Sequence, residues 1–247
     1  MRWLVQNALV AVFLGAWSVF WISLALLLTV MTFSRNVALV MARRFYSPAL
    51  IWASGAQLEV EPLPSLDWQK PHIFLMNHQS MLDIACAFSV LPVNLRFIAK
   101  HTLKYVPFLG WYMWATGMVF IDRSRRKSAY RSLAAAGQRI REGANILAYP
   151  EGTRSRDGRI LPFKKGVFML ALEAGVPVVP VAIEGSGQVV PADSFRVRPG
   201  VVRMKVGAPI ASSGKTLEGL MNEFRMQLCA LHMELGGKGG VEDSLRP

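Results

Sequence analysis

The sequence predicts an α/β protein with a mixed, largely parallel central sheet flanked by helices, preceded by an apolar helical membrane anchor. Beyond residue 54, short apolar runs alternate with helix-like stretches, which is typical of an α/β domain rather than of a helical bundle or a β-sandwich. Between Trp3 and Ser34 the chain has no charged residue, a stretch long enough for a membrane helix. The 247 residues suit one substantial domain with an accessory segment.

The N-terminal anchor is predicted over residues 1–54. As one helix its apolar part would be about 48 Å long, longer than the roughly 30 Å of a hydrocarbon core, so it must tilt, break or lie partly in the interface. The following segment mixes Arg35, Arg43 and Arg44 with apolar residues, as expected of a second helix at a charged membrane surface. A two-helix anchor in one leaflet and a single span both remain open. The Lys and Arg residues that follow the anchor predict that the domain lies on the cytoplasmic face of an inner or plasma membrane.

The composition of the chain indicates which classes of molecule it binds. Lys and Arg number 28 against 16 Asp and Glu, a formal net charge of +12, so the partners are expected to be anionic. The 52% hydrophobic residues favour membrane phospholipids over nucleic acid, for which no recognition motif is present. Cys86 and Cys229 are too few and too far apart for a disulfide framework or a zinc site. The histidine spacing likewise predicts no metal.

Residues 55–235 are predicted to form the α/β domain, and the Gly-rich residues 236–247 a flexible tail without a site. Apolar runs predict strands at 57–61, 72–76, 95–99, 118–121, 145–149, 176–183 and 201–206. Periodic stretches predict helices at 81–90, 127–142, 166–174 and 217–235.

The motif NHQSMLD, residues 77–83, lies between a predicted strand and a predicted helix. Because ligands bind at the carboxyl ends of strands in such sheets, His78 is expected in the crevice there. If His78 lies in the turn and Asp83 in the first helical turn, the carboxylate accepts the imidazole N–H and leaves the other ring nitrogen free as a base. The alternative is structural, since Ser80 and Asp83 fit a helix-capping pattern.

Cationic side chains follow two further strands. Lys100 comes directly after one strand, and the apolar residues behind it predict either part of an acyl-binding wall or a core-packing helix. Arg123 lies just beyond the next strand, and the planar fork of an arginine suits a phosphate. The run that follows Arg123 is predicted to be a solvated or lipid-facing surface.

The loop YPEGTRS, from residue 149 to 155, begins where another strand ends. Gly152 allows the backbone to approach a ligand, and Arg154 can clamp a phosphate. Glu151 can orient an arginine or a substrate hydroxyl. The alternative is ordinary turn chemistry with a surface ion pair.

These blocks, in this order, resemble those of the 1-acylglycerol-3-phosphate O-acyltransferase family of glycerolipid acyltransferases. The likeness covers about residues 60–185 and is carried by NHQSMLD, YPEGTRS and VPVVPVAI. The sequence departs from the family at Thr102, where a Glu is common, and at Tyr149, where a Phe is common.

The resemblance implies transfer of a fatty acyl group from acyl-CoA or an acyl carrier protein thioester, as co-substrate and without a cofactor, to lysophosphatidic acid. It implies His78 as the base, Asp83 as the residue that orients it, and Lys100 as a possible contact to phosphate or oxyanion. It places around the substrate phosphate Arg123, Glu151, Gly152, Thr153 and Arg154. No G-x-S-x-G motif is present, so no covalent acyl-enzyme is expected.

Two alternatives remain open. The acceptor could be glycerol 3-phosphate or a lyso-lipid with another head group. In the second alternative the chain is a non-catalytic membrane protein that binds anionic lipids, and His78 and Asp83 only cap a turn.

Overall fold

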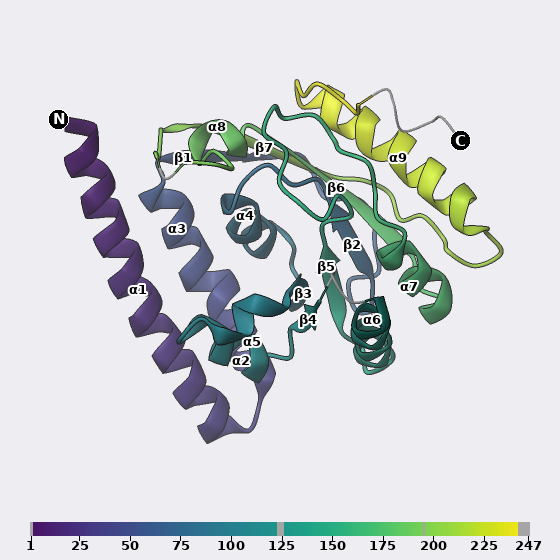
Figure 1. The fold of residues 1–247 in the computed structure, drawn as a ribbon, viewed down its shortest axis with the longest axis horizontal. Coiled ribbons are helices and arrows are strands. Elements are labelled where there is room, and N and C mark those ends of the chain that lie inside the picture. The colour runs from purple at the N-terminus through teal and green to yellow at the C-terminus, as the bar shows by residue number, and fades with distance from the viewer. Residues whose placement is uncertain (1, 123–125, 195, 242–247) are drawn as a thin grey trace.

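The computed structural model describes residues 2–122, 126–194 and 196–241 (Figure 1). Arg123 therefore lies outside the described residues. A single sheet contains seven strands in the order β1-β7-β6-β2-β5-β3-β4. Their bounds are β1 Ala56–Val60, β2 Ile73–Met76, β3 Leu95–Lys100, β4 Val119–Ile121, β5 Asn145–Ala148, β6 Val178–Glu184 and β7 Gly200–Val206. Neighbouring strands are parallel except for β6 and β7, which confirms the predicted mixed, largely parallel sheet.

Helices surround this sheet. They are α1 Arg2–Thr32, α2 Arg35–Met41, the π-helix η1 Ala42–Tyr46, α3 Ser47–Ala53, α4 Leu82–Val90, the 3-10 helix η2 His101–Tyr105, α5 Leu109–Ala115, α6 Arg126–Arg141, α7 Gly166–Ala174, α8 Ser186–Val189 and α9 Leu217–Glu234. The four helices predicted in the α/β domain, α4, α6, α7 and α9, are confirmed. The short helix α5 starts after Phe108, whose φ of 60° lies in the left-handed region and reverses the chain there.

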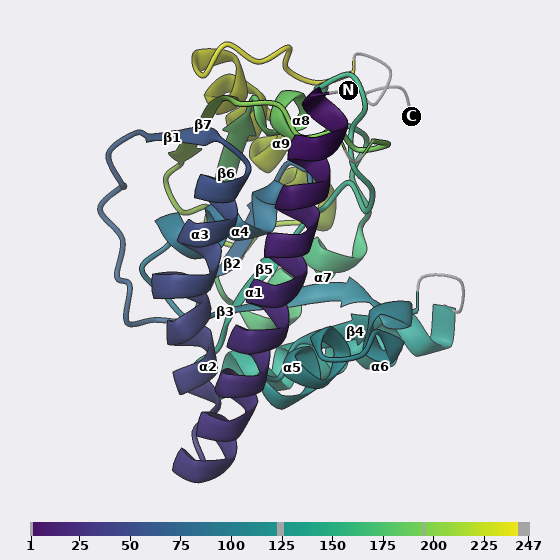
Figure 2. The same cartoon turned by 90° about the vertical axis from the view of Figure 1, so that its left-hand side faces the viewer.

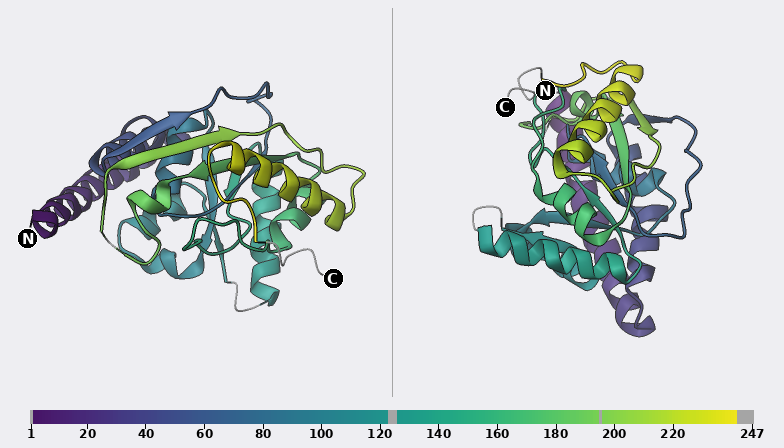
Figure 3. Two further views of the ribbon diagram at one scale, coloured as in Figure 1. Left: turned by 90° about the horizontal axis from the view of Figure 1, so that it is seen from above. Right: turned by 90° about the vertical axis from the view of Figure 1, so that its right-hand side faces the viewer.

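The core lies on both faces of the sheet, and strand β2 shows why. Phe74 and Met76 pack with α3 and α4 on one face, whereas Ile73 and Leu75 pack with α6, α7 and α9 on the other. Since alternate side chains of a strand point to opposite faces, a strand covered on both sides reads as a continuous apolar run. Figures 1 and 3 show α9 and α7 on one side of the sheet and α3 and α4 on the other.

Helix α1 runs without a break along the flank of the domain, beside α2, α3 and α5 (Figure 2). By length and composition, its residues Asn7–Thr32 could cross a membrane, and only 11% of the most apolar window is buried. Its uncovered face carries a row of exposed apolar side chains that includes Val5, Leu9 and Val12. The chain turns into α2 at Phe33, which is 94% exposed.

The start of the C-terminal tail, residues 236–241, makes hydrogen bonds to the loop that follows β5. Ile160 donates its backbone N–H to the carbonyl of Gly239, and Val241 donates to the carbonyl of Ile160. The Lys238 ammonium donates to the Asp157 carbonyl at 2.6 Å. Residues 236–241 therefore lie against the loop that follows β5, joined to it by backbone pairing and by the Lys238 side chain.

Candidate active site

The site begins where β2 ends, at the carboxyl edge of the sheet. Asn77 follows the strand, and its side-chain amide bonds both ways with the backbone of Ile183 on β6, each time at 2.8 Å. The Asn77 side chain thus continues the pairing of β2 with β6 for one more step. This pairing fixes the direction in which the chain leaves the strand and presents His78 in the turn before α4.

His78 and Asp83 meet as the sequence predicted. The Nδ1 atom of His78 lies 2.7 Å from Oδ2 of Asp83, whose side chain is fully buried. The same oxygen accepts the backbone N–H groups of Gln79 at 2.8 Å and Ser80 at 2.9 Å. One carboxylate thus holds the turn together and also binds the imidazole. The N-cap of α4 is Met81, which makes no side-chain capping bond, so Asp83 holds the turn before the helix and Ser80 is not the N-cap residue.

In the imidazole of His78, Nδ1 is hydrogen-bonded to Asp83, whereas Nε2 has no partner among the described residues. Because a carboxylate only accepts hydrogen bonds, Nδ1 carries the proton and Nε2 is the basic nitrogen. Nε2 has no hydrogen-bond partner among the described residues, and the side chain is 13% exposed. The ring stacks on that of Tyr149 with centroids 3.8 Å apart and planes at 15°.

Tyr149 contacts His78 through its ring, and its hydroxyl plays no part in this contact. The hydroxyl oxygen is buried without a hydrogen-bond partner among the described residues. Burial, and then the charge of Asp83, raise the pKa of Tyr149 well above its usual value, so the phenol stays neutral. A phenylalanine at this position would preserve the stacking, which accounts physically for the family's common residue there.

The structure gives Glu151 a different place from the predicted phosphate contact. Its Oε1 accepts the backbone N–H of His78 and its Oε2 that of Leu161, both at 2.8 Å. The side chain is 2% exposed, so both carboxyl oxygens are used inside the protein. Burial raises the pKa of Glu151 to about 8, against the lowering effect of the two N–H donors. Glu151 thus holds the backbone of His78 in place through this hydrogen bond.

The rest of the YPEGTRS loop passes alongside His78. Ser155 donates its backbone N–H to the carbonyl of His78 at 2.7 Å. Gly152 has a φ of 75°, which a side chain would strain, Thr153 is exposed, and Arg154 is half-buried. Among the described residues the Arg154 guanidinium has no hydrogen-bond or ion-pair partner, so it is available to an anion.

Lys100 ends strand β3 at the same edge of the sheet, two strands away from β2, and it is exposed. Carboxyl ends of parallel strands meet at one edge, so the structure brings Lys100 to the side of the molecule on which His78 and Arg154 lie. No described contact joins Lys100 to either residue.

A second histidine–carboxylate pair lies beside the first and was not predicted. Glu184, at the end of β6, accepts His232 Nε2 at 2.6 Å and Gln79 Nε2 at 2.7 Å through one oxygen. Burial pushes the pKa of Glu184 upward, but the bonds from His232 and Gln79 outweigh it and lower the pKa. The available sequence signal was an acidic residue that ends a long buried strand.

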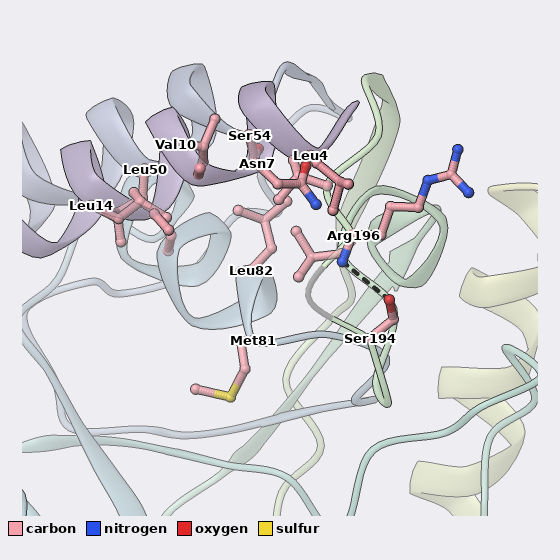
Figure 4. Close-up of a pocket in the computed structure, with 15 residues that line it drawn as sticks. Leu4, Asn7, Val10, Leu14, Leu50, Ser54, Met81, Leu82, Ser194 and Arg196 are labelled. Atoms are coloured by element: carbon pink, nitrogen blue, oxygen red, sulfur yellow. Dashed lines mark hydrogen bonds between the residues drawn. The ribbon is translucent and has the colours of Figure 1, made fainter. Parts of the chain in front are cut away.

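An apolar pocket of about 640 Å³ adjoins the His78 turn. It is lined by one face of α1, from Leu4 to Leu14, by Leu50 of α3, by Leu82 of α4, and by residues of the loop after α8. Figure 4 shows Leu82 between α1 and the loop that carries Ser194 and Arg196. Leu82 precedes Asp83 directly, so the pocket reaches the segment that holds His78.

Comparison with known proteins identifies relatives. The chain is 40% identical over 165 residues to an uncharacterised acyltransferase of Schizosaccharomyces pombe, covering 66% of this chain and 59% of the relative. It is 39% identical over 170 residues to the chloroplastic 1-acyl-sn-glycerol-3-phosphate acyltransferase BAT2 of Brassica napus, covering 68% of this chain and 48% of the relative. The chain thus spans about half to three fifths of these relatives.

The fold also matches a solved structure. The crystal structure of the 1-acyl-sn-glycerophosphate acyltransferase PlsC from Thermotoga maritima superposes with a TM-score of 0.83 at 26% identity and covers 95% of each chain. The model of the Acyltransferase family matches residues 57–184, from β1 to the end of β6. Because this match covers more than half of the 247 residues, the chain belongs to the Acyltransferase family.

Proposed function

We propose that this protein is a membrane-associated acyltransferase that moves a fatty acyl group from an acyl thioester to the free hydroxyl of lysophosphatidic acid, giving phosphatidic acid. The observation that carries the proposal is the 2.7 Å bond between His78 and Asp83, which leaves Nε2 of His78 open at the carboxyl edge of the sheet. The names of the Brassica and Thermotoga relatives support the acceptor.

In the proposed reaction, Nε2 of His78 takes the proton of the acceptor hydroxyl as its oxygen attacks the thioester carbonyl. The C–S bond then breaks, and the departing thiolate takes that proton from the imidazolium. Asp83 stabilises the imidazolium and keeps Nδ1 protonated throughout. Such acid–base catalysis contributes roughly 10² to 10⁴ in rate, so the positioning of both substrates supplies much of the remainder.

The acceptor phosphate is proposed to bind Arg154 and Lys100 at this edge, together with Arg123, which lies outside the described residues. Arg154 supports this role best, because its half-buried guanidinium has no partner among the described residues. Thr153 and the backbone at Gly152 complete the proposed phosphate loop. Glu151 supports it from below through the N–H groups of His78 and Leu161.

The acyl chain is proposed to occupy the apolar pocket between α1 and α4. Aliphatic side chains dominate its lining, and a buried methylene contributes about 0.8 kcal/mol. The uncovered apolar face of α1 would lie in the lipid, so acyl chains could pass from the bilayer into the pocket. The excess of Lys and Arg beyond α1 supports a position on the cytoplasmic face.

The experiment is a direct assay of the purified full chain in phosphatidylcholine vesicles. Acyl-CoA and acyl carrier protein thioesters are each offered with lysophosphatidic acid, lysophosphatidylcholine and glycerol 3-phosphate. We expect phosphatidic acid from lysophosphatidic acid, with the more effective thioester identifying the donor. Product from another acceptor alone would contradict the proposed substrate, and no product from a folded protein would contradict acyl transfer.

A further inference from the structure

Two arginines, Arg35 and Arg139, approach one point at the edge of the sheet opposite His78, and the charges of both act on a third, Arg96. Arg96 is the second residue of β3 and lies level with Ile146 of β5, which in turn lies level with Ile73 of β2. His78 is five residues beyond Ile73, which at about 3.3 Å per residue places Arg96 roughly 15 Å from it along the strand direction. Any ligand of this arginine cluster is therefore separate from the proposed active site.

The convergence is centred on Gly117, in the turn between α5 and β4. A Cβ added at Gly117 would lie 2.9 Å from Nη1 of Arg139 and 3.4 Å from Nη1 of Arg35, so the two guanidiniums approach one point. These arginines come from distant elements, since Arg35 begins α2 and Arg139 lies in the last turn of α6. The glycine, with a φ of 80°, leaves the space that the guanidiniums occupy.

Arg96 is the third member of this group. Burial first, and then the positive charges of Arg139 and Arg35, lower the pKa of Arg96. Its Nε atom is buried and has no hydrogen-bond partner among the described residues. A guanidinium donor that is removed from water and left unpaired is costly, so its position is better explained by a ligand that it can bind.

The cluster also lacks a compensating carboxylate. Within the described ranges no Asp or Glu forms an ion pair with Arg35, Arg96 or Arg139. The charge of Glu142 acts favourably on Arg96, but its effect is smaller than that of either neighbouring arginine. The carbonyl end of α6 offsets part of the charge of Arg139. A net positive site remains, formed by side chains from α2, β3 and α6.

We propose that Arg35, Arg96 and Arg139 bind the phosphate group of an anionic ligand. Guanidinium groups donate paired hydrogen bonds to phosphate oxygens. Arg35 and Arg139 approach one point, and the charges of both act on Arg96, so a single anion would relieve the repulsion among the three. The position favours a phospholipid head group as the source, because Phe33, 94% exposed at the end of apolar α1, is two residues before Arg35. Free inorganic phosphate presents the same chemistry. Binding at this site does not require acyl transfer.

The test compares the double variant Arg35→Gln/Arg139→Gln with a control that removes the same charge elsewhere. Arg141→Gln/Arg203→Gln is that control, since Arg141 is exposed on α6 beside Arg139, and Arg203 on β7 is paired with Glu59 on β1, the edge strand at the other end of the sheet. Binding of the full chain is measured by flotation with vesicles of phosphatidylcholine alone and with added phosphatidylglycerol. A second arm measures the thermal shift caused by inorganic phosphate.

For a lipid head group, the cluster variant should lose about thirtyfold in binding to the phosphatidylglycerol vesicles, while the control loses about threefold or less. For free phosphate, the wild type and the control should be stabilised by phosphate and the cluster variant should not. Equal losses in both double variants, together with equal phosphate responses, would overturn the proposal. If circular dichroism shows the double variant unfolded, the single variants decide on the same criteria, each with an expected loss of about fivefold.

Discussion

Two histidine–carboxylate pairs lie side by side in this protein, and they are arranged in opposite ways. In the first, the carboxylate of Asp83 is fully buried and the histidine, His78, is 13% exposed. In the second, the histidine, His232, is fully buried and the carboxylate, Glu184, is 16% exposed. Gln79 connects the pairs, because it follows His78 in the chain and donates to Glu184.

The difference lies in which nitrogen is open to a substrate. His78 gives Nδ1 to its carboxylate and keeps Nε2 open, whereas His232 gives Nε2 to Glu184 and its Nδ1 is buried without a partner among the described residues. A base must reach the proton that it removes. The first pair meets this condition and the second does not, although its hydrogen bond, at 2.6 Å, is slightly shorter than the 2.7 Å of the first. Short distance alone therefore does not identify a catalytic pair.

The largest contrast is expected when the carboxylates are neutralised. Asp83→Asn keeps the side-chain shape but removes the charge that holds the imidazole tautomer, so kcat should fall roughly 10²- to 10⁴-fold. Glu184→Gln, the matched change in the other pair, should lower kcat by less than about tenfold. Steady-state assays on folded variants measure both, and similar losses in the two variants would remove the distinction between the pairs.

A smaller effect, on the KM, is expected from the loop beside His78. Arg154→Gln removes the free guanidinium of the proposed phosphate loop, so the KM for lysophosphatidic acid should rise about 10- to 100-fold. Arg156→Gln, an exposed residue of the same loop, is the control and should change the KM little. If both variants keep the wild-type KM, Arg154 does not bind the phosphate.

The burial of Glu151 should affect how the stability of the protein depends on pH. Burial raises the pKa of Glu151 from 4.5 to about 8, so the native state favours the protonated carboxyl. The contribution of this group is then fully present below pH 4.5 and is lost as the pH rises through about 8. The Tm of the wild type should therefore fall relative to that of Glu151→Gln over this range.

The exposed Glu173 on α7 provides the control for that measurement. Glu173→Gln should follow the wild-type pH dependence throughout. A Glu151→Gln variant with the same slope as the wild type would show that the carboxyl is not buried in this way.

The smallest effect concerns the ring on which His78 stacks. Tyr149→Phe removes a buried hydroxyl that has no described partner, so activity should be kept and the free energy of unfolding should rise by about 1 kcal/mol or stay unchanged. Tyr105→Phe, whose side chain is 72% exposed, should leave stability unchanged. Denaturant unfolding measures both, and a clear loss of stability in Tyr149→Phe would mean that the hydroxyl has a partner.

The sequence predicted the sheet well, and most clearly its central strands β2, β5 and β6, which are buried on both faces. These three read as largely apolar runs bounded by polar, Gly or Pro residues, and all seven predicted strands lie within two residues of those observed. The meeting of His78 and Asp83 was also predictable, since it depends on one local turn. Neither feature requires knowledge of long-range packing.

What the sequence did not predict depends on distant segments. Gln79 and Glu184 are 105 residues apart, and Glu184 and His232 are 48 apart, so no local pattern joins them. The sequence placed Glu151 at the substrate phosphate because the direction of its side chain cannot be read from a local pattern. That direction is set by the backbone N–H groups of His78 and Leu161, which only the folded loop brings together. The positions of Glu151 and Glu184 are therefore set by tertiary contacts and cannot be read from the type of residue.

The most direct test of the central claim compares His78→Gln with His232→Gln in one assay of kcat/KM for lysophosphatidic acid. Glutamine can keep a hydrogen bond in either place but is not a base. We expect His78→Gln to lose about 10³-fold or more and His232→Gln to lose less than about tenfold. Retained activity in His78→Gln, or an equal loss in a folded His232→Gln, would contradict the assignment of His78 as the base.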